Sequence, residues 1–357
     1  MKKVLFVNHC LSSGGSEKAM TLVANYFAEH GIDVTMILLN DEPKVYKVND
    51  KINIEECYCP VEGNKIAWQY RRLHTIRDAV KRNNPDVIVT FMSENNARVI
   101  AATLGMGKYI VQSERCNPYV VSKMVKLAMK TIMKKADYTV FQTQQAREFY
   151  PKKIQRKSTI IANALPENLP EINRNVINKK IIAVGRFSQQ KNFELLINAF
   201  SIFSKNVPEY RLVIYGDGPL RESLEKQVSL LGINESVKLP GYISNVIEEL
   251  SDAAMYISTS NYEGISNAML EAMAMGVPCI CTDCPVGGAR DMIVSDYNGI
   301  LIPVGDEQRL VEAMTKIAGD DELASKISRH AVEIREKCSM DSIGKLWMEA
   351  CKCDFNG

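Results

Sequence analysis

Short β-branched runs alternate with helical stretches along this chain, and no other feature of the sequence limits its fold as strongly. In the first half these runs are KVLFVN, DVTMILL, DVIVTFM, KYIVQ and YTVFQ, and helical spacing appears between them at 17–29, 66–82 and 119–135. Strands that alternate with helices form right-handed βαβ units. The pattern therefore predicts a parallel sheet covered by helices on both faces.

The alternation stops once and then begins again. Residues 165–178, LPENLPEINRNVIN, contain two prolines and a polar run, and KKIIAVG, YRLVIYG, SVKLPG, AAMYIST and VPCICT follow. Because 357 residues are also too many for a typical single core, we predict an α/β fold with two Rossmann-like, doubly wound domains. The predicted parts are an N-terminal domain at 1–165, a linker at 166–178, a C-terminal domain at 179–340, and a C-terminal helix at 341–357 that returns toward the first domain. Such sheets bind ligands at the carboxyl ends of their strands, so the expected site is the cleft between the domains.

Composition and charge narrow the class of protein. A formal charge of +2 gives no general attraction to nucleic acid. The apolar N-terminal run stops at Asn8, which is short for a signal sequence, and no stretch approaches the ~18 apolar residues of a membrane span. The ten cysteines lack the spacing of a zinc site. We therefore expect a cytosolic or peripheral protein whose cysteines are small buried hydrophobic residues.

Two loops that follow predicted strands have residues suited to an anion. In LSSGGSEK, Gly14 and Gly15 allow a ligand to approach the backbone, and Ser16 is a candidate cap for the next helix. In VGRFSQQKN, Arg186 and Lys191 offer a bidentate fork and a point charge for a diphosphate. An ordinary βα turn explains the glycine loop as well, and solvated surface cations are the simpler explanation of Arg186 and Lys191 if their loop is taken alone.

Neither glycine loop has the spacing of a dinucleotide fingerprint. GGSEK lacks the pattern GxGxxG, and YGDGPLR has Arg221 where the third glycine belongs. The sequence therefore argues against NAD chemistry.

The stretch NYEGISNAMLEAMAMGVPCI keeps two glutamates in a segment that is otherwise small or apolar. A helix is predicted to begin near Ser266 and to end at Gly276, which leaves Glu263 in the loop and Glu271 inside the helix. About five helical residues rise ~7.5 Å, so the two carboxylates reach different parts of one extended ligand. The carboxyls of a retaining glycosidase stand ~5 Å apart across one bond, and nothing in this spacing requires that arrangement.

The stretch NYEGISNAMLEAMAMGVPCICTDCPVGGARDMI resembles the signature of the retaining nucleotide-sugar glycosyltransferases of family four, which have the GT-B fold. The shared pattern is two glutamates separated by seven residues, then EAMA-G-P and a glycine pair. VGRFSQQKN, YGDGPLRESLE, VKLPGYISN and DYNGILIP occur in the order of the family, so the strong match spans about residues 180–305. The N-terminal half resembles the family only in its layout and its GG loop.

This resemblance implies roles for individual residues. Arg186 and Lys191 would neutralise the donor diphosphate and the leaving group, and Glu263 would hold hydroxyls of the transferred sugar. Glu271 would accept hydrogen bonds from the ribose. The remaining implied donor contacts are Gly14, Gly15 and the amides of Gly264, Ile265 and Ser266 near the phosphate, and Pro240, Gly241 and Tyr242 near the base. The family fold needs no metal and no cofactor, because fixed cations take the place of the ion.

One departure from the family concerns the acceptor side. Many relatives carry a histidine after the fifth strand of the first domain, whereas this region reads VQSERCNP, residues 111–118. Glu114, Arg115 or Asn117 are the candidates to replace that histidine. A plain cap for the helix after Pro118 explains the same residues as well.

The resemblance implies a hexosyltransferase that moves a sugar, with retention, from a nucleoside-diphosphate sugar, expected to be UDP-linked, to a sugar hydroxyl. By analogy with short bacterial relatives, the expected acceptor is a polyprenyl-diphosphate-linked saccharide in capsule, O-antigen or exopolysaccharide assembly. The alternatives are a non-catalytic GT-B subunit that binds a partner glycosyltransferase, a GT-B-fold epimerase and a glycosidase. The presence of Arg186, Lys191, Glu263 and Glu271 argues against a subunit without activity.

The helix predicted at 119–135 is rich in lysine. Lys123, Lys126, Lys130 and Lys134 recur at helical steps and predict a basic stripe. A core-packed helix with a solvated basic face accounts for this pattern. The functional alternative adds docking on anionic lipid at the inner face of the cell membrane, where each lysine contributes ~1 kcal/mol.

Overall fold

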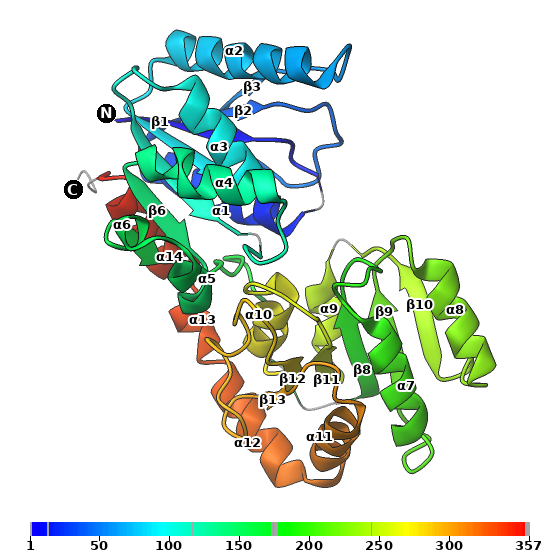
Figure 1. Ribbon diagram of the computed structural model, residues 1–357. Helices are drawn as coiled ribbons and strands as arrows, with labels where there is room; N and C mark the ends of the chain where they lie inside the picture. The colour runs from blue at the N-terminus through cyan, green and yellow to red at the C-terminus, as the bar shows by residue number, and fades with distance from the viewer. Residues whose placement is uncertain are drawn as a thin grey trace. The chain divides into compact units, whose positions relative to one another are not determined.

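The computed structural model describes residues 2–353 except residues 13, 116, 173, 175–177 and 244. The chain divides into two compact units (Figure 1). Unit 1 comprises Met1–Pro166 and Cys338–Gly357, and unit 2 comprises Glu167–Lys337. The linker predicted at 166–178 lies partly outside the described residues.

Unit 1 contains one fully parallel sheet. Its strands are β1 (Lys3–Asn8), β2 (Asp33–Leu38), β3 (Asn53–Glu56), β4 (Val87–Phe91), β5 (Tyr109–Glu114), β6 (Tyr138–Phe141) and β7 (Ser158–Ile160). Their order across the sheet is β3-β2-β1-β4-β5-β6-β7, with Val4 of β1 in register with Val34 on one side and Val87 on the other. The order reverses between β1 and β4, so the carboxyl ends of these two strands form the switch point where doubly wound sheets bind ligands.

Helices cover both faces of this sheet. They are α1 (Gly15–Glu29), α2 (Lys65–Asn83), α3 (Ser93–Ala102), α4 (Lys123–Lys130), the 3-10 helix η1 (Ile132–Lys135), α5 (Gln144–Phe149), α6 (Lys152–Gln155) and α14 (Met340–Ala350). Successive side chains of a strand point to opposite faces, so Phe6 of β1 joins the core with α1 and α14, while Leu5 joins the core with α2.

Helix α14 brings a distant part of the chain into the core of unit 1. Trp347 is fully buried and stacks on Phe91 with ring centroids 5.3 Å apart. Gly344 allows α14 to approach α1, because a Cβ at this position would lie 2.4 Å from ring atoms of Tyr26. Residues more than two hundred positions apart in sequence therefore share one core.

Unit 2 contains a second fully parallel sheet. Its strands are β8 (Asn178–Val184), β9 (Arg211–Tyr215), β10 (Val237–Gly241), β11 (Ala253–Ser258), β12 (Cys279–Thr282) and β13 (Ile300–Ile302), in the order β10-β9-β8-β11-β12-β13. Its helices are α7 (Phe193–Phe203), α8 (Arg221–Leu230), α9 (Val246–Leu250), α10 (Asn267–Ala274), α11 (Glu307–Gly319), α12 (Asp321–Ala331) and α13 (Ile334–Lys337). The order reverses between β8 and β11, whose carboxyl ends carry the candidate site.

The prediction of two doubly wound parallel sheets is confirmed. The short strands β3, β7 and β13 were not predicted, because β3 is polar and β7 and β13 have three residues each. The prediction of one helix at 119–135 is wrong. The structure has α4 (Lys123–Lys130) followed by a separate 3-10 turn, so the lysines are not on one continuous helix.

Two expectations from composition have structural counterparts. The nine described cysteines are buried free thiols, as predicted, and burial raises the pKa of Cys57 and of Cys284 to about 11. No described helix is both long and apolar enough to cross a membrane.

Candidate active site

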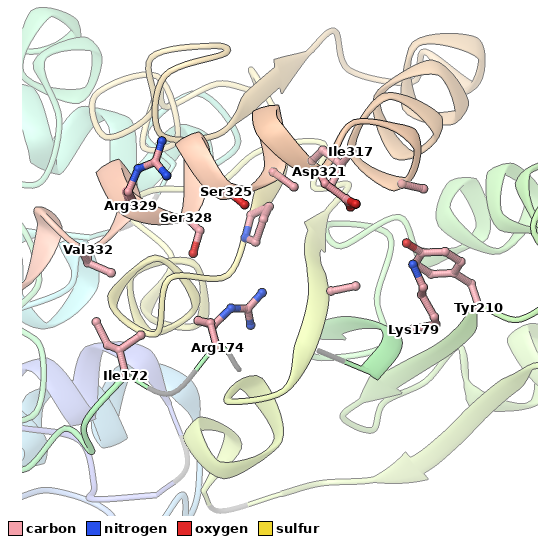
Figure 2. Close-up of a pocket in the computed structure, with 14 residues that line it drawn as sticks. Ile172, Arg174, Lys179, Tyr210, Ile317, Asp321, Ser325, Ser328, Arg329 and Val332 are labelled. Carbon is pink, nitrogen blue, oxygen red and sulfur yellow. The ribbon is translucent and has the colours of Figure 1, made fainter. Parts of the chain in front are cut away.

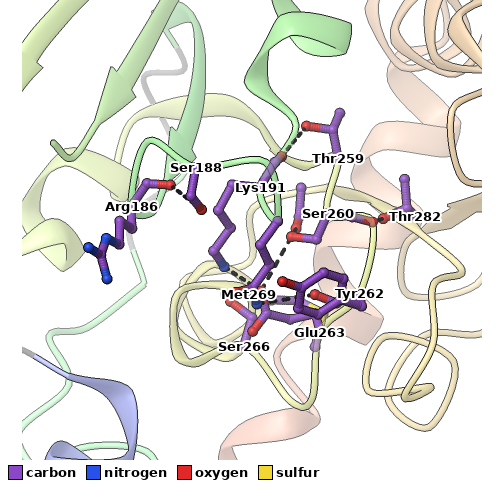
Figure 3. Close-up of polar contacts among 12 residues, drawn as sticks. Arg186, Ser188, Lys191, Thr259, Ser260, Tyr262, Glu263, Ser266, Met269 and Thr282 are labelled. Atoms are coloured by element: carbon purple, nitrogen blue, oxygen red, sulfur yellow. Dashed lines mark hydrogen bonds and ion pairs between the residues drawn. The ribbon is translucent and has the colours of Figure 1, made fainter. Parts of the chain in front are cut away.

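An ion pair joins two loops at the carboxyl edge of unit 2. Lys191 follows β8 and Glu263 follows β11, and these strands are neighbours in the sheet. Lys191 Nζ lies 2.5 Å from Glu263 Oε2 (Figure 3), and the two side chains are 16% and 22% exposed. The pair therefore combines partial burial with access to a ligand at the edge of the sheet.

The loop that carries Lys191 is shaped by a glycine and a threonine. A Cβ on Gly185 would lie 2.8 Å from Lys191 Cε, so the absence of a side chain there lets the lysine pass across the backbone. Thr259 Oγ1 donates to the carbonyl oxygens of Lys191 and Asn192, both at 3.0 Å. The end of β11 thus fixes the backbone of the lysine loop.

The loop that carries Glu263 is held by the turn after β12. Glu263 donates its amide to Pro285 O at 2.7 Å, and Val286 donates its amide to Glu263 O at 3.2 Å. Gly288 approaches so closely that a Cβ on it would lie 1.8 Å from Gly264 O. Ser266 then caps α10 by accepting from the Met269 amide at 3.4 Å, which confirms the predicted start of this helix.

Three side chains donate to the same oxygen of Glu263. Besides Lys191, Ser260 Oγ lies 3.3 Å and Gln190 Nε2 lies 3.4 Å from Oε2. Within the described part of the chain, no side chain donates to Oε1. The hydrogen bonds to Oε2 therefore fix the Glu263 carboxylate, and Oε1 can still accept hydrogen bonds from a ligand.

Gln190 and Ser260 were absent from the residues selected by sequence. Gln190 immediately precedes Lys191 in VGRFSQQKN, and Ser260 precedes the NYEG turn, so both stood inside motifs already singled out. Thr282 Oγ1 in turn donates to Ser260 O at 2.6 Å. The polar side chains of Ser260 and Thr282 at the ends of neighbouring strands could have indicated these contacts from the sequence.

Arg186 is on the same loop as Lys191 but is not part of the ion pair. Its side chain is exposed and points away from Lys191 and Glu263 (Figure 3). Its guanidinium makes no hydrogen bond or ion pair with any residue that the structure describes. The structure therefore brings Lys191 and Glu263 together and leaves Arg186 at the solvent side of the loop.

The second glutamate of the motif lies in a different environment. Glu271 is inside α10 and is 4% exposed, whereas Glu263 is in the preceding loop. The two carboxylates therefore occupy separate elements, which agrees with the interpretation that they are not an acid–base pair.

The residues assigned to the nucleotide base lie at the end of β10. Gly241 has φ of 101° and accepts from the Gly216 amide at 2.8 Å, while Tyr242 is 59% exposed. Because β10 is three positions from β11 in the sheet, Tyr242 and Glu263 follow strands that are well separated along one edge.

The glycine loop of unit 1 differs in one detail from its prediction. Gly14 is the N-terminal cap of α1 and Gly15 is its first residue, with no side-chain cap. Ser16 therefore lies inside the helix, and the expectation that it caps this helix is wrong. Gly14 and Gly15 belong to unit 1, whereas the other predicted donor residues belong to unit 2.

Glu114 is turned into the interior of unit 1. Its carboxylate accepts from Ser93 Oγ at 2.6 Å, Asn96 Nδ2 at 2.5 Å and Tyr150 OH at 2.7 Å. Burial raises its pKa, against the effect of these hydrogen bonds. Glu114 thus stabilises the ends of α3 and β5 and has no side-chain oxygen directed to solvent.

Arg115 and Asn117, the other two candidates for the acceptor side, make contacts within unit 1. The Arg115 guanidinium lies 4.4 Å from the centroid of the Phe91 ring, donates to Ser113 Oγ at 3.2 Å and donates to Asn163 Oδ1. Burial lowers the pKa of Arg115 to about 9. Asn117 Oδ1 accepts from the Tyr119 amide at 2.9 Å, so it supports the local turn.

A cavity of 540 Å³ lies at the opposite end of the unit 2 sheet (Figure 2). Its lining comes from the amino ends of β8, β9, β11 and β12 and from α11 and α12, with Arg174, Lys179, Tyr210 and Asp321 among its polar side chains. None of the predicted site residues lines it. The carboxyl edge, rather than the cavity, therefore carries the candidate active site.

The chain is similar to known proteins in sequence and in structure. Residues 166–333 match the family model for glycosyl transferases group 1. The chain is 24% identical, over 98% of each chain, to a Campylobacter jejuni α-1,4-N-acetyl-D-galactosaminyltransferase named for a diNAcBac-PP-undecaprenol-linked acceptor. It is 23% identical to AmsD, an amylovoran biosynthesis glycosyltransferase of Erwinia amylovora, over 97% of this chain and 98% of AmsD. The structure of Anabaena HepE in complex with UDP and glucose matches with a TM-score of 0.85 and 16% identity, over 99% of this chain and 100% of HepE. This likeness shows the GT-B fold.

Proposed function

We propose that this chain, whose residues 166–333 match the family model for glycosyl transferases group 1, moves a sugar from a UDP-sugar to a hydroxyl of a lipid-linked saccharide. The transfer retains the anomeric configuration and extends a bacterial surface polysaccharide. The name of the Campylobacter relative supports the lipid-linked acceptor, AmsD supports polysaccharide biosynthesis, and the HepE complex supports UDP.

The arrangement of Glu263 carries this proposal. Lys191, Ser260 and Gln190 all bind Oε2, which leaves Oε1 to accept hydrogen bonds from hydroxyls of the transferred sugar. A carboxylate whose position is already fixed loses little conformational entropy when a sugar binds. The same oxygen stabilises positive charge that develops on the sugar ring as the bond to the diphosphate breaks.

Lys191 and Arg186 are the proposed partners of the diphosphate. An ammonium has three N–H donors, and the ion pair with Glu263 uses one of them, so two remain for phosphate oxygens. Arg186 is exposed on the same loop, and its planar guanidinium suits bidentate binding of phosphate. Together these two cations supply the positive charge that a divalent metal would otherwise supply, so the proposed reaction needs no metal.

The length of the carboxyl edge suits an extended nucleotide sugar. From β10 to β11 there are three strand spacings, or about 14 Å. We assign the base to Pro240, Gly241 and Tyr242, and the ribose to Glu271. The phosphates lie near the amides of Gly264, Ile265 and Ser266, with Gly14 and Gly15 as further donor contacts.

The membrane contact in this proposal rests on unit 1. Lys123 and Lys135 are exposed, and so are the apolar side chains of Tyr119, Val120 and Leu127 in the same segment. Lysines and apolar side chains together suit a surface of anionic lipid. The enzyme would then work at the inner face of the cell membrane, where a polyprenyl-linked acceptor is available.

One assay tests the reaction. The protein is incubated with UDP-, GDP- and ADP-sugars, with and without a short-chain isoprenyl-diphosphate-linked saccharide, and the released nucleoside diphosphate is measured. We expect UDP release that depends on the saccharide, and a product whose anomeric proton has the configuration of the donor. Inversion at the anomeric carbon, or release from GDP- or ADP-sugars alone, would contradict the proposal.

A further inference from the structure

His9 lies at the switch point of the unit 1 sheet. It directly follows β1, and Asn95 of α3 ties the ends of the two flanking strands by donating to Val7 O at 2.9 Å and Thr90 Oγ1 at 3.1 Å. His9 also begins the loop that ends at Gly14. Doubly wound sheets bind their ligands at this position, beside the carboxyl ends of the two strands.

Met92 lies at the other strand end of the switch point. It follows β4 and has φ of 75° and ψ of 133°, a conformation that L-residues rarely adopt. Such residues persist where the surrounding structure fixes them, and they cluster at functional sites. The two strand ends of the switch point thus carry a histidine on one side and a strained backbone on the other.

A buried arginine fixes the orientation of His9. Arg72 of α2 is 3% exposed, and its Nη2 lies 2.8 Å from His9 Nδ1 and 3.0 Å from Asn40 Oδ1. Because a guanidinium can only donate, His9 Nδ1 accepts, and the proton of the neutral imidazole is on Nε2. Burial and the charges of Arg72 and Arg98, opposed by Glu42, lower the pKa of His9 to about 4, which agrees with a neutral ring.

The other ring nitrogen of His9 has no partner among the residues that the structure describes. His9 is half-buried, and none of the described residues accepts a hydrogen bond from Nε2. Arg72 makes no ion pair with a described carboxylate, and its guanidinium lies 5.2 Å from the centroid of the Trp68 ring. The fold therefore keeps an arginine buried beside a histidine and leaves one N–H of that histidine available.

We propose that His9 Nε2–H donates a hydrogen bond to a hydroxyl or ring oxygen of the acceptor saccharide, with Arg72 as its positioning residue. This inference rests on the proposed function and adds an acceptor-binding residue to it. Because the lone pair of Nδ1 is engaged by Arg72, His9 recognises a neutral oxygen and does not act as a base. It also offers a donor on the acceptor side, where the candidate Glu114 is turned inward.

Kinetics of matched variants test the inference. His9→Phe removes the donor, and we expect the KM for the isoprenyl-diphosphate-linked saccharide to rise about tenfold while the affinity for UDP is unchanged. His9→Gln, which places an amide N–H near the position of Nε2, should recover most of this loss. His74→Phe is the control, because His74 is an exposed histidine of the same unit that packs beside Tyr70 with ring centroids 4.3 Å apart. A KM within twofold of wild type in His9→Phe would overturn the inference.

Nitrogen-15 NMR of the histidine rings supplies a readout independent of turnover. We expect the wild type to show His9 as the Nε2–H tautomer at pH 6, and the Nε2 resonance to move when the saccharide is added. In Arg72→Lys the tautomer preference should weaken. A charged His9 at pH 6, or a resonance that saturating saccharide leaves in place, would contradict the inference.

The two levels of proposal fail in different ways. A wild type that does not bind UDP contradicts the proposed function, whatever His9 does. A wild type that binds UDP but uses no saccharide contradicts the acceptor class, and the inference falls with it. Normal turnover of the saccharide with an unchanged KM in His9→Phe contradicts the inference alone.

Discussion

Lys191 Nζ lies 2.5 Å from Glu263 Oε2, and this contact joins loops that follow two adjacent strands, 72 residues apart in sequence. In the proposed function, the cation of this pair faces the diphosphate of the nucleotide sugar and the anion faces its sugar ring. Each partner thus sets the position of the other before a ligand arrives. The predictions for unit 2 follow from this preorganised pair.

Glu263→Gln should lower turnover about 100-fold while the affinity for UDP stays near that of wild type. The substitution removes a charge that stabilises the transition state, whereas UDP contains no transferred sugar. Turnover is measured by UDP release, and affinity by calorimetry. If UDP affinity fell as much as turnover, Glu263 would instead hold the nucleotide or the loop.

Arg186→Ala and Lys191→Ala should each weaken UDP binding about tenfold and slow the reaction. The diphosphate is charged in the ground state and in the transition state, so both quantities respond. Arg329→Ala is the matched control, because Arg329 is also an exposed arginine of unit 2 but lies at the cavity on the opposite edge. Unchanged UDP affinity in both site variants would show that Arg186 and Lys191 do not bind the diphosphate.

Gly288→Ala should destabilise unit 2 by about 2 kcal/mol or more, because the new Cβ would lie 1.8 Å from Gly264 O and would push the Glu263 loop aside. Gly319→Ala is the control, since a Cβ at Gly319 meets nothing within 4 Å. Thermal unfolding of both variants provides the comparison. Equal melting temperatures would show that the loop adapts without cost.

Removal of divalent metal should leave the activity intact. The proposed diphosphate partners are Arg186 and Lys191, so treatment with EDTA followed by assay in metal-free buffer should give the rate of the untreated enzyme. Restoration of a lost rate by Mg²⁺ or Mn²⁺ would show that an ion, and not the two cations alone, neutralises the leaving group.

Replacement of Lys123, Lys126, Lys130 and Lys134 by glutamine should abolish pelleting with anionic liposomes and leave UDP binding unchanged. The wild type should pellet at low salt, should dissociate as salt rises and should ignore neutral liposomes, because the attraction is electrostatic. A control with Lys205, Lys226, Lys238 and Lys326 of unit 2 changed to glutamine carries the same loss of charge. Equal loss of binding in the control would mean that only net charge matters.

The sequence predicted the buried strands well, because runs such as those of β1 and β11 are apolar on both faces and have few alternatives. It predicted one helix at 119–135, because periodicity continues across a break in the backbone that no proline or glycine signals. The strands β3 and β13 escaped notice, because three or four residues carry too little pattern.

The candidate site was predictable in its residue types and only partly in its contacts. Glu263 and Lys191 were selected as separate ligand contacts, and their ion pair depends on the adjacency of β8 and β11, which local sequence does not encode. Glu114 was selected for the acceptor side, but Ser93, Asn96 and Tyr150 turn it inward from distant positions. His9 drew no attention, since only its contact with Arg72 makes it distinctive.

The packing of Trp347 against Phe91 has a consequence for synthesis on the ribosome. Unit 1 contributes the first residues to emerge, yet its core needs α14, which is translated only after all of unit 2. During synthesis, the apolar surface around Phe91 therefore stays exposed to solvent until α14 has been translated. Unit 2, by contrast, already has all the residues that it needs to fold. Unit 2 should thus finish folding before unit 1, although it is translated later. Until α14 is translated, the incompletely folded unit 1 should bind chaperones.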